Sequence, residues 1–443
     1  SGGGGAGTMA RTVIQIRDEE PGQDRASLLV SASQVNGKKQ GGPIIYPEDQ
    51  SGEWISQLFA DIDAIAAELA YTPHDGSPPV PLYFTDWSPA SQEKAWESVS
   101  VKGSFLALGG KRPVGRMLGS TAEIGKSVER VYTSPLRLLL VISAAGVSGL
   151  NEWTQIYQGL KASQLDFRIH AIVAEPDLID LLKTLSDSAV TYEMLYSDND
   201  LAARYDEMIH RSVVNFMPNV LHFFCHGVVK TNLPMIELAT RKDHIMGAGR
   251  GSVLLGEELF ENLRAGTSTI WLVVLNCCNG AVPKNGASLV KRVAEKGFPA
   301  VIGMQAEISA QSAAIFSGEL YRTFAIAIKE NLFGSNGSWA VEWATLLTKP
   351  RFQLCKDSSG VPNAAEIKDW IYPVLYVCRE AFTLVQKEVL AQGENRQNLL
   401  GMLQTFKSMR ETLASAGANT PQAMLDAIDA QILQVTTKLA NLT

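Results

Sequence analysis

The sequence predicts an α/β fold in which a mostly parallel sheet is flanked by helices. Several short segments, 136–142 and 271–275 among them, are apolar at almost every position, as expected of strands covered on both faces. Segments with helical spacing, such as 176–185 and 200–216, separate these runs. Because strands and helices alternate, most of the sheet should be parallel.

The N-terminal part predicts two strands and a helix before this alternation begins. Residues 12–16 and 26–30 are apolar runs joined by a polar turn, and 54–70 has apolar residues at helical spacing. The proline-rich residues 71–90 are predicted to be a loop. The later elements follow in order: strands 136–142 and 167–173, helices 176–185 and 200–216, strands beginning at 220 and 271, helix 287–296 and strand 300–304.

The C-terminal segment predicts a helical hairpin. Apolar residues recur with a seven-residue repeat over 399–413 and again over 425–442. Gly417 is typical of a helix end, and Thr420-Pro421 is typical of a helix start. Two helices joined in this way are antiparallel. The hairpin either packs on its own domain or forms a docking surface, and the sequence leaves both open.

These elements define four expected regions. Residues 1–8 resemble the remnant of an expression tag, and 9–130 hold the strand-strand-helix region. The α/β core is expected over 131–380, and the hairpin over 381–443, with a role in docking or oligomerisation.

Composition narrows the class of protein. The net charge of −7 argues against a broad nucleic-acid surface, and no apolar run reaches the length that spans a bilayer. An odd number of cysteines, five, without framework spacing predicts a reducing cytoplasm, and no signal peptide follows Met9.

Two polar tips at strand ends predict the functional site. His226 ends the run that begins at Val220, and Cys278 follows the run that begins at Trp271, 52 positions after the histidine. The carboxyl ends of parallel strands meet at one edge of a sheet, so these side chains are expected to converge. A cysteine nucleophile needs a base and later an acid, and one imidazole can serve as both.

The chain resembles the CHAT-family peptidases, a branch of the caspase, metacaspase and separase clan. The matching segments are 135–141, 222–227, 275–280, 297–303, 319–321 and 370–376. The resemblance implies that His226 and Cys278 are the catalytic pair. It also implies that the main-chain N–H groups of Gly227 and Cys278 form the oxyanion hole. Cys277 stands where the family usually has a small, alanine-like residue.

Neighbouring residues and other motifs have plainer interpretations. Cys277, His222 and Cys225 are expected to pack in the core, because successive strand residues point to opposite faces. The cysteines and histidines lack the paired spacing of a structural zinc site, so neither a metal nor a cofactor is expected. The glycine-bearing segments 119–127 and 247–252 lack the spacing of nucleotide-binding loops.

The expected function is that of a regulated cysteine endopeptidase that cleaves specific protein targets, which the resemblance associates with bacterial defence or cell death. The long segment 228–252 is predicted to be a loop that becomes ordered when an activating partner binds, or on self-assembly through the hairpin. Met304, Gln305 and Glu307 are predicted to line the substrate pocket, with Glu307 favouring a basic side chain. The alternative is a dormant peptidase-like scaffold that binds partner proteins.

Overall fold

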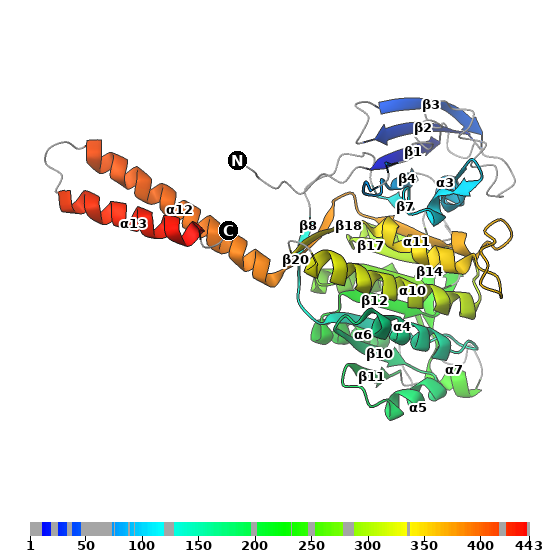
Figure 1. The fold of residues 1–443 in the computed structure, drawn as a ribbon. Helices are drawn as coiled ribbons and strands as arrows, with labels where there is room; N and C mark the ends of the chain where they lie inside the picture. Colours follow the sequence, from blue (N-terminus) through cyan, green and yellow to red (C-terminus); the bar gives the residue numbers. More distant parts are fainter. Residues whose placement is uncertain are drawn as a thin grey trace. The chain divides into compact units, whose positions relative to one another are not determined.

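The computed structural model describes most of the chain as two compact units (Figure 1). The first is made of residues up to 128, 134–329 and 340–382, and the second of 129–133, 330–339 and 383–443. The described residues are 11–18, 25–32, 38–45, 73–74, 76–86, 89–92, 94–118, 128–195, 202–231, 233–246, 253–277, 288–334, 337–415 and 422–440.

The first unit is built on a large, mostly parallel sheet, which confirms the predicted fold class. Its strand order in the described residues is β11-β10-β9-β12-β16-β17-β19-β7-β4-β1-β2-β3. The strands are β1 (Thr12–Asp18), β2 (Arg25–Ala32), β3 (Lys38–Ile45), β4 (Leu82–Asp86), β7 (Val114–Met117), β9 (Leu136–Ile142), β10 (Phe167–Val173), β11 (Val190–Met194), β12 (Val220–Phe224), β16 (Leu272–Asn276), β17 (Ala300–Met304) and β19 (Pro373–Val377). Neighbours are parallel from β11 to β17 and from β19 to β1. The β17–β19, β1–β2 and β2–β3 pairs are antiparallel.

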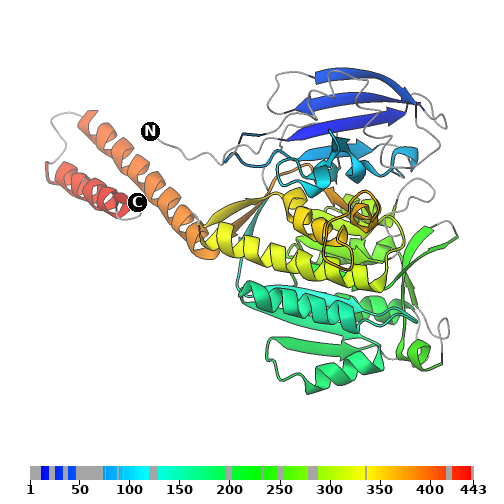
Figure 2. The same ribbon diagram turned by 45° about the vertical axis from the view of Figure 1, so that its right-hand side comes forward.

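Helices cover both faces of the parallel strands. The α-helices described in this unit are α3 (Pro89–Gln92), α4 (Leu150–Ser163), α5 (Pro176–Thr184), α6 (Ala202–Phe216), α7 (Arg241–Met246), α8 (Glu257–Gly266), α9 (Leu289–Glu295), α10 (Ala310–Ile328) and α11 (Trp343–Leu354). Helices α4, α10 and α11 lie side by side on one face, as both Figure 1 and Figure 2 show. Helices α6, α8 and α9 supply buried residues to the core on the other face.

Alternation along the strands assigns each residue to one of these faces. Leu221, Phe223 and Cys225 belong to the core formed with α6, α8 and α9, and so does Cys277. His222 points to the opposite face and is also fully buried. Cys225 and Cys277 are 5% and 2% exposed, which confirms the predicted burial of both thiols.

Two glycines allow α4 and α10 to approach closely. A Cβ atom added at Gly159 would lie 2.3 Å from the main-chain oxygen of Gly318. A Cβ at Gly318 would lie 2.9 Å from the main-chain oxygen of Gln155. Since neither backbone can move without disturbing a whole helix, this crossing requires residues without side chains.

The prediction of a loop over 71–90 is wrong, because it contains β4. This strand pairs in parallel with β1 on one side and β7 on the other. The run Leu82-Tyr83-Phe84 is short and follows Pro81, so the prolines obscured it. Pro81 precedes the first strand residue, where a missing N–H does not interrupt the ladder.

The prediction of a long loop over 228–252 is also wrong where the structure describes it. Strands β13 (His226–Lys230) and β14 (Leu233–Leu238) form an antiparallel hairpin, α7 follows, and β15 (Val253–Leu255) pairs with β14. Residues alternate between buried and less buried along β14, and Ile236 and Leu238 join the core. This period of two marks a half-buried strand. Residues 247–252 lie outside the described part.

The second unit contains the predicted C-terminal hairpin. Helices α12 (Lys387–Ser415) and α13 (Gln422–Ala440) pack against each other, and Arg410 forms an ion pair with Asp429 across them. Strands β8 (Val128–Tyr132), β18 (Ser338–Val341) and β20 (Phe382–Gln386) form a small sheet. The predicted turn at Gly417 and Thr420-Pro421, and the predicted helix 54–70, lie outside the described residues.

Candidate active site

His226 lies where β12 gives way to the β13–β14 hairpin. Its side chain is partly buried, and its Nε2 atom is 2.7 Å from the main-chain oxygen of Ala145. A carbonyl oxygen can only accept, so this contact assigns the ring proton to Nε2. In the neutral ring the lone pair is then on Nδ1, which can act as a base.

The acceptor of this hydrogen bond sits in a turn that is tied to its neighbours. The turn 143–149 joins β9 to α4, and the N–H of Ser143 donates to the oxygen of Phe224 at the end of β12 over 2.8 Å. At the other end of the turn, the N–H of Gly149 donates to a carboxylate oxygen of Glu175 over 2.7 Å. Glu175, which directly precedes α5, thereby caps the start of α4, and Ala145 is held between two anchors.

The cysteine side of the site is described as far as Cys277. Strand β16 is parallel to β12, and Asn276 at its end is in register with Phe224. Cys277 is packed in the core, and Cys278 lies outside the described residues. Gly227, predicted to share the oxyanion hole with Cys278, is on β13 beside His226 and pairs with Ile236.

A buried polar network lies between these strands and the helices that cover them. The Asn276 amide donates to Glu152 Oε1 on α4 over 2.8 Å, and His222 Nε2 is 3.0 Å from the same oxygen. This second contact is close enough for an ion pair but is not aligned as a hydrogen bond. His222 Nδ1 is 2.9 Å from the hydroxyl of Tyr321 on α10. Burial raises the pKa of Tyr321 well above its usual value, and the charge of Glu152 raises it further.

Sequence reasoning did not anticipate this network, nor the carbonyl of Ala145. Glu152 is on the first turn of α4, where an acidic residue usually contacts solvent. A main-chain oxygen has no signature in a sequence at all. Tyr321 fell in a matching segment, but only the structure brings it to His222.

The three residues predicted for the substrate pocket lie in different surroundings. Met304 ends β17 and is fully buried, and Gln305 uses both ends of its side-chain amide within the protein. Glu307 is exposed. Glu307 is therefore the one of the three whose functional group is free to meet a substrate at the surface.

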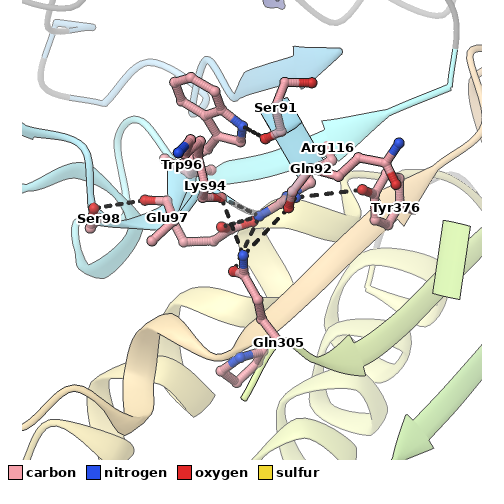
Figure 3. Close-up of polar contacts among 12 residues, drawn as sticks. Ser91, Gln92, Lys94, Trp96, Glu97, Ser98, Arg116, Gln305 and Tyr376 are labelled. Carbon is pink, nitrogen blue, oxygen red and sulfur yellow. Dashed lines mark hydrogen bonds and ion pairs between the residues drawn. The ribbon is translucent and has the colours of Figure 1, made fainter. Parts of the chain in front are cut away.

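Gln305 belongs to a buried cluster around Arg116 on β7 (Figure 3). Arg116 and Glu97 are both nearly inaccessible and form a bidentate ion pair with distances of 3.0 and 2.9 Å. The other guanidinium N–H groups donate to the main-chain oxygens of Gln92 and Lys94, at 2.8 and 2.9 Å, and to the side chain of Gln305, at 3.3 Å. Such a bidentate pair fixes both position and orientation.

The same cluster reaches the start of α9. The side-chain oxygen of Gln92 accepts from the N–H of Ser288 over 3.3 Å, and Ser288 caps α9 through its hydroxyl. Ser288 is the first described residue after Cys277. Residues on both sides of the undescribed segment are therefore held by buried polar contacts, through Asn276 before it and Gln92 after it.

Other kinds of site find little support in the described part of the chain. It contains no group of three histidine, cysteine or acidic residues placed to hold a metal ion. None of the helices it includes is both long enough and apolar enough to cross a membrane.

Comparison with known proteins agrees with the resemblance noted in the sequence. The CHAT domain family matches residues 10–331, well over half of the chain. The chain belongs to the CHAT family. Among solved structures, this CHAT protein is similar to a chain of the Saccharomyces cerevisiae separase–securin complex, with 12% sequence identity and a TM-score of 0.37. The match covers 73% of this chain and 17% of the yeast chain, so the CHAT protein spans less than a fifth of that chain's length. The comparison with curated proteins gave no match.

Proposed function

We propose that this CHAT protein is a cysteine endopeptidase in which His226 is the base and Cys278 the nucleophile. The observation that carries the proposal is the hydrogen bond from His226 Nε2 to the oxygen of Ala145. It leaves Nδ1 as the basic atom. His226 follows β12, and Cys278 follows β16, the strand paired with β12. Membership of the CHAT family adds support of a different kind.

The proposed reaction follows from these roles. His226 Nδ1 takes the proton from the Cys278 thiol, and the thiolate attacks the carbonyl carbon of a peptide bond. The main-chain N–H groups of Gly227 and Cys278 donate to the oxyanion. His226 then gives its proton to the leaving amine, which leaves a thioester on Cys278. Water hydrolyses the thioester with His226 again as base, and the thiol is restored. The oxygen of Ala145 stabilises the imidazolium in each step.

Regulation is part of the proposal. The α12–α13 hairpin exposes several large apolar side chains, namely Leu400, Met402, Met409, Met424 and Leu433. Exposed apolar groups on a helical hairpin suit an activating protein partner or self-assembly. We place the protein in a bacterial defence or cell-death pathway by family association alone.

Substitution of the dyad tests the proposal. Cys278→Ala and His226→Ala should each reduce cleavage of a protein substrate by at least about 10³-fold. Cys277→Ala is the matched control, since it removes the neighbouring thiol from the core, and it should retain cleavage. All three should keep the wild-type circular dichroism spectrum. Cleavage by the Cys278→Ala protein would rule out the assignment. If no wild-type cleavage occurs with any partner, a dormant binding scaffold is the better description.

The proposed preference for a basic residue before the scissile bond rests on Glu307. Glu307 is exposed and follows β17, the strand paired with β16. In a peptide library the wild-type protein should cleave after Arg or Lys. Glu307→Gln should reduce kcat/KM for such peptides by about ten-fold, as expected for a lost charge-assisted hydrogen bond. Glu319→Gln, on α10, removes a carboxylate elsewhere and should change nothing. Cleavage after aspartate, or an unchanged preference in Glu307→Gln, would exclude this role.

A further inference from the structure

The buried network around Glu152 joins the three parts of the fold that make up the proposed site. Glu152 Oε1 accepts from Asn276, which ends β16 two residues before Cys278. The same oxygen is 3.0 Å from His222 on β12, four residues before His226. Glu152 itself is on the first turn of α4, directly after the turn that carries Ala145.

Burying this network costs more free energy than an apolar core would. Glu152 is 1% exposed, and its Oε2 atom has no hydrogen-bond partner among the described residues. Asn276 Oδ1 is also buried and has no hydrogen-bond partner among the described residues. Burying a carboxylate and an amide with unfilled acceptors costs free energy that apolar side chains of the same size would not. Such groups specify geometry rather than add stability.

The position of Glu152 on α4 reduces this cost. The first turn of a helix has unpaired N–H groups and a partial positive charge, which favour a carboxylate. The amide of Asn276 also donates to Ser317 over 3.0 Å, and Tyr321 meets His222 from the same helix, α10. The network therefore receives contacts from α4, α10, β12 and β16, and each contact orients one of these elements relative to the others.

We propose that Glu152 is a positioning residue that sets the geometry of His226, Ala145 and the end of β16. The proposal rests on the function given above for His226 and Cys278. The main-chain ladder between β12 and β16 aligns the two strands along their length. Ser143 ties the turn of Ala145 to the end of β12, and Glu175 holds its other end, but neither contact fixes the start of α4 against the end of β16. Glu152 makes that connection, so its loss should shift the acceptor of His226 without unfolding the sheet.

Two substitutions at this position separate geometry from charge. Glu152→Gln keeps an oxygen that can accept from Asn276, whereas Glu152→Leu removes every polar contact. Glu152→Leu should reduce kcat by roughly 100-fold at an unchanged KM, the loss expected from a misplacement of about 1 Å. Glu152→Gln should stay within about five-fold of the wild type, because one hydrogen bond of ordinary strength is at stake.

A spectroscopic readout tests the inference without turnover. The ¹⁵N spectrum of the histidine side chains should show His226 as the Nε2–H tautomer in the wild type, assigned by comparison with His226→Ala. In Glu152→Leu a mixture of tautomers is expected, because the Ala145 acceptor is no longer in place. Leu160→Ala is the matched control: it removes a fully buried side chain from the same helix and lies outside the network. It should lower the melting temperature but leave kcat and the tautomer unchanged.

Each outcome then decides the matter. Wild-type kcat and tautomer in Glu152→Leu would overturn the proposal. The proposal would also be overturned if Leu160→Ala, with the same melting temperature as Glu152→Leu, lost as much kcat, because reduced stability alone would then explain the loss. A changed tautomer in a protein without proteolytic activity would support the positioning role and exclude the proposed function. Should Glu152→Leu fail to fold, Asn276→Ala applies the same two readouts from the strand side.

Discussion

The buried charges around Arg116 predict an unusual order of stabilities. Glu97 is the carboxylate of this cluster: it forms the ion pair with Arg116, and its charge raises the pKa of Arg351. Arg351 is fully buried, and its guanidinium donates to the main-chain oxygens of Val114 and Pro373, at 2.7 and 2.8 Å. Burial lowers the pKa of Arg351 to about 10, Glu97 opposes this shift, and Arg116 adds to it. Arg116 pairs directly with Glu97, and the charge of the same carboxylate also favours the charged form of Arg351.

Glu97→Gln keeps the shape of the side chain, removes its charge and replaces one of its two acceptor oxygens by an amide donor. Both guanidinium groups would then be buried without a counter-charge from Glu97, and breaking a buried pair in this way costs about 3–5 kcal/mol. Arg116→Met in the same background removes one of the two like charges. The double variant should therefore be more stable than Glu97→Gln alone by at least about 1 kcal/mol, because repulsion between the cations is gone. It should stay below the wild type, since the oxygens of Gln92 and Lys94 lose the hydrogen bonds that Arg116 donates to them.

Urea unfolding of the first unit measures these differences. Trp96 is a convenient fluorescent reporter, since it is buried and stacked on Phe84 with ring centroids 5.1 Å apart. Ser98→Ala is the control: its hydroxyl donates to the oxygen of Ala95, three residues earlier, so the free energy of unfolding should change by less than about 1 kcal/mol. A loss below about 1 kcal/mol in Glu97→Gln, or a double variant that is no more stable, would refute the electrostatic argument.

Three further outcomes are expected. Gly159→Ala should destabilise the first unit by about 1–3 kcal/mol, because its Cβ meets the backbone of α10. Gly401→Ala on α12 has open space around it and should stabilise its helix by up to about 1 kcal/mol. Thermal melts of both variants check this. Iodoacetamide at pH 8 should modify Cys278 well before Cys378, whose pKa burial raises to about 11; peptide mapping that finds Cys378 first would contradict this. Deleting residues 396–443 should reduce partner binding or self-assembly, measured by light scattering, while the first unit keeps its melting temperature; loss of folding would instead make the hairpin structural.

The sequence revealed the parts of the fold that bury apolar residues on both sides. Strands β9, β12 and β16 are nearly continuous apolar runs, so their existence and parallel order followed from pattern alone. Shorter or half-buried strands could not be identified from the pattern alone. β4 was concealed by neighbouring prolines, and β14 was assigned to a loop because the length and glycines of the segment 228–252 outweighed its period of two.

The candidate site divides in the same way. His226 and Cys278 could be proposed from the sequence because reactive side chains at strand ends carry a signature of residue type and order. Glu152 resembled an ordinary acidic residue on the first turn of a helix, and only the packing of α4 on the sheet buries it. Contacts of this kind join residues far apart in the sequence, such as Glu152 and Asn276, and no local pattern predicts them.

The most important acceptor in the site cannot be removed by substitution, because the oxygen of Ala145 belongs to the main chain. Its position depends instead on side chains that hold the two ends of α4's first turn. Glu175 accepts from the N–H of Gly149 outside the helix, and Glu152 accepts from Asn276 inside the core. The two carboxylates act on the same short segment. If the Nε2–H tautomer of His226 depends on this segment, replacing either Glu175 or Glu152 should disturb it. The double substitution should then have a less than additive effect, as expected of two groups that hold one element.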